Sequence, residues 1–140
     1  MTAKQEVEKL MNDLVPFAKR MLSERGEFYP FGGYVKREGG IVHVGAEQVG
    51  TDQPKSADLF LLLKQSFQEK ARNDECRATA ILADVRIVPP GSSQKSDAIQ
   101  VSLDHKDGYT AEVFYPYRRE NGGIVYESIF AQKGDGDIFQ

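Results

Sequence analysis

The chain has a single cysteine, Cys76, and only two histidines, His43 and His105. One thiol cannot close an intrachain disulfide, and no group of cysteines and histidines has the spacing of a zinc site. The chain also lacks the G-x-S-x-G turn of a serine nucleophile, and neither glycine-rich nucleotide fingerprint occurs. We therefore predict no catalytic residues, no metal and no cofactor.

Long apolar runs and concentrated positive charge are missing as well. No apolar stretch approaches the ~20 residues that a membrane-spanning helix needs, and the opening stretch MTAKQEVEKLMND is too charged for a signal peptide. The formal net charge is −3, and the longest basic cluster, Arg118-Arg119, is followed at once by Glu120. A nucleic-acid surface would need clustered Lys and Arg. These features predict a cytoplasmic protein that binds neither membrane nor nucleic acid.

What is present is the composition of an ordinary globular domain. The chain has 140 residues, of which 40% are hydrophobic and 28% charged. A chain of this length can bury enough apolar surface for one core. No linker separates two cores, so we predict a single α+β domain over residues 1–140, with a frayed tail at 133–140.

Two segments have the 3.6-residue apolar periodicity of amphipathic helices. The first begins with a capping-box pattern at Thr2 and Gln5 and ends near Gly26. The second begins at residue 54 or 56 and ends at Arg72. Between them, the glycines at 39 and 40 predict the turn of a β-hairpin.

After residue 74 the pattern changes to strands. The run RATAILADVRIV is rich in β-branched residues, and AIQVSLDH alternates apolar with polar residues. Turn signals at residues 106–108 and 121–122 divide the C-terminal half into a four-stranded antiparallel meander. The predicted fold is α+β in the order α-β-β-α-β-β-β-β, with two amphipathic helices packed on one face of the antiparallel sheet.

The turns also predict the register of the meander, because a one-residue slip moves every side chain to the opposite face of a sheet. The predicted pairs are Leu103 with Ala111, Val101 with Val113, Tyr117 with Tyr126 and Val113 with Phe130. One face becomes apolar, and the other, the mixed face, combines polar with apolar residues. Its predicted members are Leu82, Asp84, Arg86, Gln100, Ser102, Asp104, Thr110, Glu112, Phe114, Val125 and Ile129.

The mixed face has three interpretations. It is either a solvated surface with a few apolar residues, which is common, or a patch that pairs subunits or receives a partner. The third is a catalytic cleft built on Asp84, Asp104 and Glu112. Acid–base catalysis would require a water-poor pocket that separates their pKa values, and cross-strand pairing with Arg86 is the simpler explanation.

The run AILADVRIVPPGSSQKSDAIQVSLDHKDGYTAEVFYPYRR, with PFGGYVKREGGIVHVGAE upstream, resembles a family of small, uncharacterised bacterial proteins. The features that carry the resemblance are a PFG segment, a D-A-I strand, an acid-His-x-x-Gly turn and a PYR segment. The resemblance implies a bacterial cytoplasmic origin. It brings no activity and no catalytic residues.

The first functional interpretation is a non-catalytic protein-binding module, comparable with an immunity protein or a dedicated chaperone. Its partner would be another protein or a second copy of itself. Interfaces favour aromatic anchors, which bury a large area at a low entropic cost. The predicted contact residues are Tyr29, Phe31 and Tyr34 on the first hairpin and Phe114 and Ile129 on the mixed face.

The alternative is a small-molecule-binding protein or an enzyme with a pocket between the first hairpin and the main sheet. The polar groups of this pocket would come from His43, Asp84, Arg86 or Glu112. A small-molecule ligand would raise the melting temperature of the protein, whereas a protein-binding module would not respond to metabolites. Both interpretations stay open on the sequence alone.

Overall fold

The computed structural model describes residues 1–46 and 53–140. Glu47, the last residue of the PFG segment quoted above, lies outside the described residues. In these residues two helices and seven strands follow one another, one strand more than predicted. The elements are α1 (Ala3–Arg25), β1 (Phe31–Lys36), β2 (Ile41–Val44), α2 (Ser56–Arg72), β3 (Cys76–Ile87), β4 (Ser96–His105), β5 (Thr110–Glu120), β6 (Gly123–Tyr126) and β7 (Phe130–Lys133). The predicted α+β class is confirmed.

Helix α1 begins and ends where its capping signals predict. The Gln5 backbone N–H donates to the Thr2 hydroxyl at 3.1 Å, and the Thr2 N–H donates to the Gln5 side-chain oxygen at 2.8 Å. At the other end Gly26 has a φ of 80°, a left-handed conformation that suits glycine. The buried stripe between these caps contains Glu6, Val7, Leu10, Met11, Leu14, Val15, Ala18 and Leu22.

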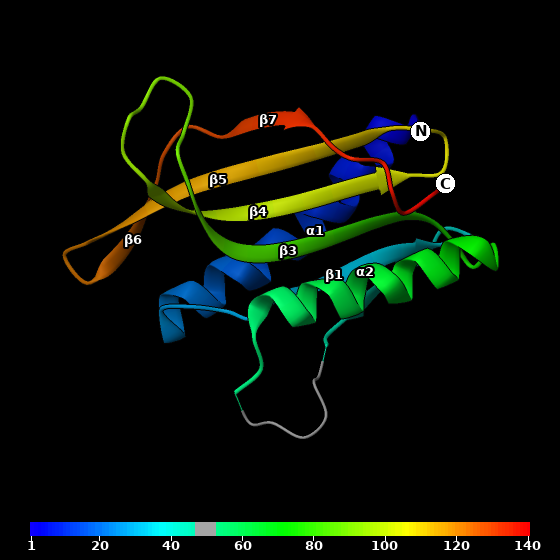
Figure 1. The fold of residues 1–140 in the computed structure, drawn as a ribbon, viewed down its shortest axis with the longest axis horizontal. Helices are drawn as coiled ribbons and strands as arrows, with labels where there is room; N and C mark the ends of the chain where they lie inside the picture. Colours follow the sequence, from blue (N-terminus) through cyan, green and yellow to red (C-terminus); the bar gives the residue numbers. More distant parts are fainter. Residues whose placement is uncertain (47–52) are drawn as a thin grey trace.

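The strands form one antiparallel sheet in the order β2-β1-β3-β4-β5-β6, and β7 also pairs with β5. Strands β6 and β7 pair with consecutive parts of β5, so they are two pieces of one sheet edge (Figure 1). Three predicted pairs are confirmed: Leu103 with Ala111, Val101 with Val113 and Tyr117 with Tyr126. The turn chemistry therefore predicted the register of β4, β5 and β6 correctly.

The predicted pairing of Val113 with Phe130 is wrong by one residue. Val113 pairs with Ala131, and Phe114 pairs with Phe130. The chain leaves the ladder at residues 127–129, and an irregularity of this kind changes the face of every residue beyond it. Phe130 therefore lies on the same side as Phe114, and the two rings stack with their centroids 4.9 Å apart.

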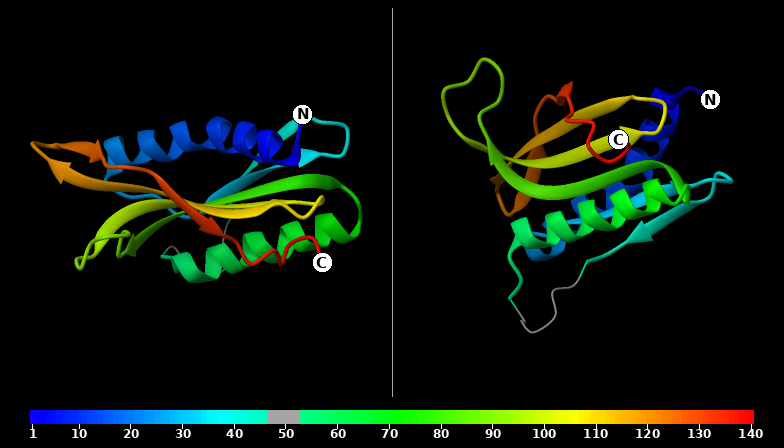
Figure 2. Two further views of the ribbon diagram at one scale, coloured as in Figure 1. Left: turned by 90° about the horizontal axis from the view of Figure 1, so that it is seen from above. Right: turned by 45° about the vertical axis from the view of Figure 1, so that its right-hand side comes forward.

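The two helices cover opposite faces of the sheet, not one face as predicted (Figure 2). Leu82 belongs to the apolar cluster under α1, whereas Ile81 packs with Phe67 in a second cluster under α2. Neighbouring residues of a strand point to opposite faces, so these two clusters define an α1 face and an α2 face. Strand β3 is apolar on both sides along this stretch, and its pattern could not assign α2 to either face.

Two adjacent glycines in β1 allow both helices to approach the sheet closely. A Cβ atom on Gly33 would lie 3.1 Å from the Leu14 side chain of α1. One on Gly32 would lie 3.2 Å from the Phe67 ring of α2 and 2.3 Å from the Ala80 carbonyl oxygen. The Gly-Gly pair of the first hairpin is thus a packing feature of both layers.

The C-terminal tail packs against α2, although we predicted it to be frayed. Ile138 is 5% exposed and belongs to the α2 cluster. The Asp137 carboxylate pairs with Lys64, and the Asp137 carbonyl oxygen accepts a hydrogen bond from the Gln68 amide at 2.9 Å. The tail therefore lies beside α2 on the α2 face of the sheet (Figure 2).

Candidate functional site

A cavity of about 450 Å³ lies on the α2 face, where helix α2, the strands β3 to β5 and the C-terminal tail meet. Its volume falls within the range of small-molecule sites, roughly 300–1,000 Å³. The sheet forms the floor, and α2 and the tail form walls. Three segments that are far apart in the sequence thus build one concave surface.

One end of the cavity is apolar and the other carries carboxyl groups. The register of the sheet places Ala83 beside Gln100, and Asp104 beside Thr110, at different ends of the floor. Ala57, from the first turn of α2, lies among the lining residues. The mainly apolar end is lined by Pro30, Ala57, Phe60, Ala83 and Val85, together with Ser56, Asp84 and Gln100. The polar end is lined by Ser102, Asp104, Thr110, Glu112, Asp135 and Asp137, and Ile81 and Ile138 lie beside them.

Asp104 is buried at the polar end without full hydrogen bonding. It is 8% exposed, and its Oδ1 atom has no hydrogen-bond partner within the described residues. Burial raises the pKa of its carboxyl to about 7, against the effect of a hydrogen bond from Thr110. The charges of Asp137 and Glu112 add to the rise, and Lys64 opposes it. A charged carboxyl with an unpaired buried oxygen destabilises a fold.

Glu112 faces the same cavity from β5. Its Oε1 atom accepts hydrogen bonds from the Ser102 hydroxyl at 2.8 Å and from the Gln100 amide at 3.2 Å. Burial raises the pKa of Glu112 despite these two bonds, and the charges of Asp135 and Asp137 raise it further. The polar end therefore holds several acids whose negative charge the chain itself compensates only in part.

Of the four predicted pocket residues, Glu112 and Asp84 line this cavity. Asp84 pairs with Ile99 of the α1 cluster, so its side chain lies on the α1 face and not on the predicted mixed face. Its carboxylate accepts a hydrogen bond from the Tyr117 hydroxyl at 2.5 Å, and burial raises its pKa. Asp84 is therefore engaged on the α1 side, and Glu112 is the predicted residue that faces the cavity directly.

The other two predicted pocket residues lie elsewhere. Arg86 alternates with Asp84 along β3, so it also lies on the α1 face, where it donates to the Asp97 carboxylate at 3.1 Å. His43 of β2 has its Nε2 atom 2.6 Å from an Asp13 carboxylate oxygen of α1. These contacts fasten β3 to β4 and the first hairpin to α1.

Two of the five predicted partner-contact residues are well exposed. Tyr29 is 51% and Ile129 is 56% exposed. Phe114 is only 5% exposed, because the ring of Phe130 stacks on it. The one-residue slip of the edge strand thus removes Phe114 from the accessible surface.

The remaining two predicted contact residues pack within the fold. Phe31 makes an edge contact with Phe28, with ring centroids 5.7 Å apart. Tyr34 contacts the ring of Phe67 in α2, and the Lys70 ammonium group lies 5.0 Å from the Tyr34 ring centroid. Tyr34 therefore helps to hold α2 on the first hairpin.

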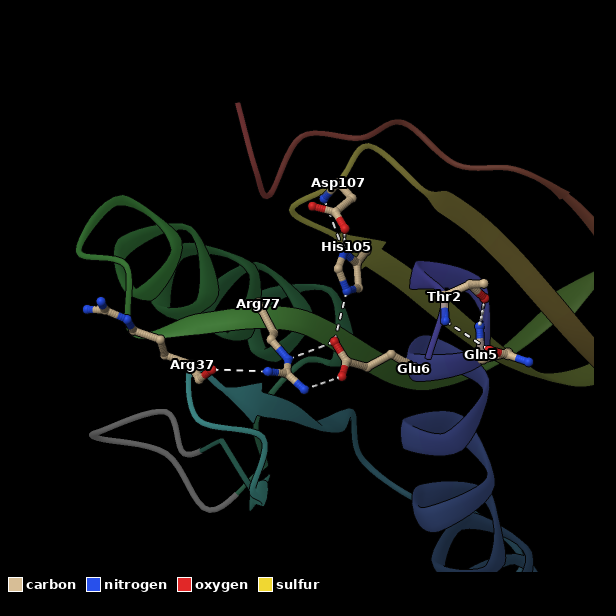
Figure 3. Close-up of polar contacts among 7 residues, drawn as sticks. All are labelled: Thr2, Gln5, Glu6, Arg37, Arg77, His105 and Asp107. Atoms are coloured by element: carbon tan, nitrogen blue, oxygen red, sulfur yellow. Dashed lines mark hydrogen bonds and ion pairs between the residues drawn. The ribbon is translucent and has the colours of Figure 1, made fainter.

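Sequence reasoning missed Glu6, an acid on the buried stripe of α1. Figure 3 shows its carboxylate between Arg77 and His105. Arg77 donates through Nε at 2.8 Å and through Nη2 at 2.5 Å, and His105 Nε2 lies 2.9 Å from Glu6 Oε1. Burial alone would raise the Glu6 pKa, but the bonds from Arg77 and His105 outweigh it and lower the pKa. An acid on an apolar helix stripe was the signal available in the sequence.

The surroundings of Glu6 identify this cluster as a structural connection. His105 Nδ1 accepts the Asp107 backbone N–H at 3.0 Å, which leaves Nε2 to carry the proton toward Glu6. Arg77 also donates to the Arg37 carbonyl oxygen at 3.1 Å. Each polar group is thus satisfied by the protein, and the cluster joins α1 to β3, β4 and the first hairpin.

No family model, curated protein or solved structure matches the chain. Within the described residues, neither helix has the length and apolarity needed to cross a membrane. The same residues contain no group of three or more His, Cys, Asp or Glu side chains arranged to hold a metal ion. The function therefore has to be inferred from the geometry of the cavity.

Proposed function

We propose that the protein is a non-catalytic binding protein that takes a small molecule in the cavity between α2, the sheet and the tail. The observation that carries this proposal is the Oδ1 atom of Asp104, which lies buried at the cavity without a partner among the described residues. Buried polar groups in native proteins are nearly always hydrogen-bonded. An unpaired carboxylate oxygen at a cavity of about 450 Å³ supports a ligand that supplies the missing donor.

Three residues with the potential for nucleophilic or acid–base chemistry are engaged away from this cavity. Cys76 is 2% exposed, and burial raises its pKa to about 11, so the thiol stays protonated at neutral pH. His105 uses both ring nitrogens within the Glu6 cluster, and His43 is bonded to Asp13. These observations favour binding over catalysis.

Thermal denaturation of the protein with a panel of small-molecule fragments tests this proposal. Ala57 is an exposed residue of α2 that lines the cavity, so a tryptophan at this position would fill the opening without disturbing the core. We expect several fragments to raise the melting temperature of the wild type, and Ala57→Trp to abolish the response.

The matched control is Leu61→Trp, at an exposed position of the same helix that does not line the cavity. This variant should respond as the wild type does. A wild type that responds to no fragment, or an Ala57→Trp variant that responds fully, would contradict the proposal.

Contact with another protein or with a second copy of the chain is the second candidate function. The exposed side chains of Tyr29 and Ile129 favour it. Light scattering after size-exclusion chromatography tests the homodimer, and a monomeric mass at high micromolar concentration would exclude it.

A cytoplasmic, bacterial setting belongs to the same proposal, supported by the free thiol of Cys76 and by the resemblance described above. The net charge of −3 supports a protein that does not bind nucleic acid.

A further inference from the structure

We infer that the ligand of this cavity is an organic cation, with an ammonium group bound at Asp104 and Glu112 and an apolar body against the N-terminal part of α2. This inference rests on the proposed binding function and specifies the chemical class of the ligand. It follows from the charge of the polar end, the buried carboxylate and the apolar lining of the other end.

The charge of the cavity selects a cation. Four carboxyl groups line the polar end, those of Asp104, Glu112, Asp135 and Asp137. Lys64 is the one basic residue among the lining residues that the structure describes, and it already pairs with Asp137. Carboxylates that share one site repel each other, so a positive group would be attracted there and an anion would be repelled.

The arrangement of the acids favours an ammonium group over a metal ion. Calcium takes six to eight oxygen ligands at short distances, and the described residues include no group of three or more acids arranged for that purpose. An ammonium group has three donors that several separate acceptors can share. Asp104 and Glu112 supply such acceptors from adjacent strands of the cavity floor.

The other end of the cavity suits the hydrocarbon part of such a ligand. Phe60 and Ala57 of α2 and Ala83 of β3 line it with apolar surface. Removing apolar surface of the ligand from water against this end would favour binding. A charged group at one end and an apolar body at the other therefore match the two ends of the cavity.

The affinity for such a ligand should rise with pH. Asp104 has a pKa of about 7 in the folded protein, and the charged groups that face it are Lys64 of α2, Glu112 of β5 and Asp137 of the tail. An alkylammonium group stays charged in this range, because amines of this type have a pKa of about 10. Raising the pH through neutrality deprotonates Asp104 and so strengthens its attraction for the cation.

The test uses isothermal titration calorimetry of the full chain with three probes that share one apolar body. The probes are phenethylammonium, 2-phenylethanol and 3-phenylpropanoate, which are cationic, neutral and anionic. We expect the cation to bind most tightly, and more tightly at pH 8 than at pH 6. Equal or tighter binding of the alcohol or the carboxylate would overturn the cation inference while preserving the proposed binding function. Absence of binding by all three probes would contradict both.

Three substitutions locate the binding of phenethylammonium. Asp104→Asn and Glu112→Gln should each lower the affinity about tenfold, since each removes one charge-assisted hydrogen bond. Asp135→Asn, in an exposed part of the tail where folding is not at risk, should lower it a few-fold. Asp104→Asn should also abolish the rise in affinity between pH 6 and pH 8.

The control variant is Glu127→Gln, which removes the same charge from an exposed site outside this cavity. Its affinity for phenethylammonium should equal that of the wild type. An equal loss in Glu127→Gln would show that only net charge matters, and unchanged affinity in Glu112→Gln and Asp135→Asn would exclude the cavity. Either result overturns the inference.

Discussion

The two faces of the sheet use alternate residues of the same strands and yet differ in how completely they are covered. The α1 face is apolar at Ala80, Leu82 and Leu103, each at most 1% exposed. Asp104 on the α2 face holds a buried oxygen without a partner in the described residues, as do Thr79 on the α2 face and Tyr126 on the α1 side. Of these three residues, Asp104 is the one that lines the cavity. A strand can thus serve the core on one side and present polar groups to a cavity on the other.

The coverage of the two faces explains this difference. The 23-residue helix α1 packs against a continuous apolar cluster that extends from β1 to β5. The 17-residue helix α2 packs mainly near β1 and β3, and the tail approaches the α2 face from the other side (Figure 2). The cavity lies where these two segments meet over β4 and β5. We therefore expect the α1 face to dominate stability.

The largest effect should come from truncating a side chain of the α1 face. Leu103 is 1% exposed, and Leu103→Ala should lower the free energy of unfolding by about 2–5 kcal/mol because it leaves a cavity under α1. Ser102→Ala, one residue earlier and on the α2 face, should lower it by only about 1 kcal/mol through the lost bond to Glu112. Chemical denaturation measures both. Equal losses would refute the difference between the faces.

The next effect concerns the glycines that both layers share. A Cβ atom at Gly32 would collide with the Ala80 carbonyl oxygen and press on Phe67, so Gly32→Ala should lower the free energy of unfolding by about 1–3 kcal/mol. Gly45 has nothing within 4 Å of its Cβ position, and Gly45→Ala should change the stability by less than about 0.5 kcal/mol. Thermal and urea unfolding of the two variants would compare them directly. If Gly32→Ala leaves the free energy of unfolding unchanged, α2 and the sheet can move apart at this position without a loss of stability.

The last effect depends on pH and concerns the electrostatic side of the comparison. Asp104 has a folded-state pKa of about 7, above the value of about 3.9 expected in the unfolded chain. Between these pH values the folded protein holds a proton that the unfolded chain has lost, so stability falls as the pH rises from about 4 to 7 and then levels off. Asp104→Asn has no such proton and should be more stable than the wild type at pH 8 by up to about 4 kcal/mol, because the folded and unfolded pKa values differ by about three.

At pH 4 the two proteins should have nearly the same stability, since Asp104 is then protonated in the folded state. The comparison of the two proteins isolates the contribution of Asp104, because Glu112 and Glu6 are the same in both. The raised pKa of Glu112 also makes stability fall as the pH rises. The lowered pKa of Glu6 makes stability rise with pH, in a lower pH range. Denaturation curves measured from pH 4 to pH 8 test this. If the free energy of unfolding of both proteins depends on pH in the same way, burial does not raise the pKa of Asp104.

The features predicted correctly from the sequence are those set by short-range rules. The caps of α1 depend on Thr2, Gln5 and Gly26, and the register from β4 to β6 depends on two turns whose residues specify their geometry. Apart from the slip of β7 at residues 127–129, the errors concern long-range packing. The face that α2 covers is set by where the first hairpin joins β3, and no local pattern encodes that position.

The cavity was predictable only in part for the same reason. Glu112 was named as a pocket residue and Asp104 as a member of a carboxylate set, because both alternate with apolar residues along their strands. The tail, which we predicted to be frayed, forms part of the wall of the cavity that both residues line. Ile138 holds this tail in place by packing in the α2 cluster with Leu63 and Phe67, which lie about half the chain length away in the sequence.

The interrupted edge of the sheet has a consequence for self-association. In the described part of the chain, the outer strands β2, β6 and β7 have four residues each, whereas β3, β4 and β5 have 12, 10 and 11. A long exposed edge offers a row of unpaired N–H and C=O groups on which another chain can polymerise as added strands. Here each edge offers only a short row, and the break at residues 127–129 keeps two of the rows apart. The sheet is thereby protected against fibre growth from either side, with no need for a third helix to cover its edges.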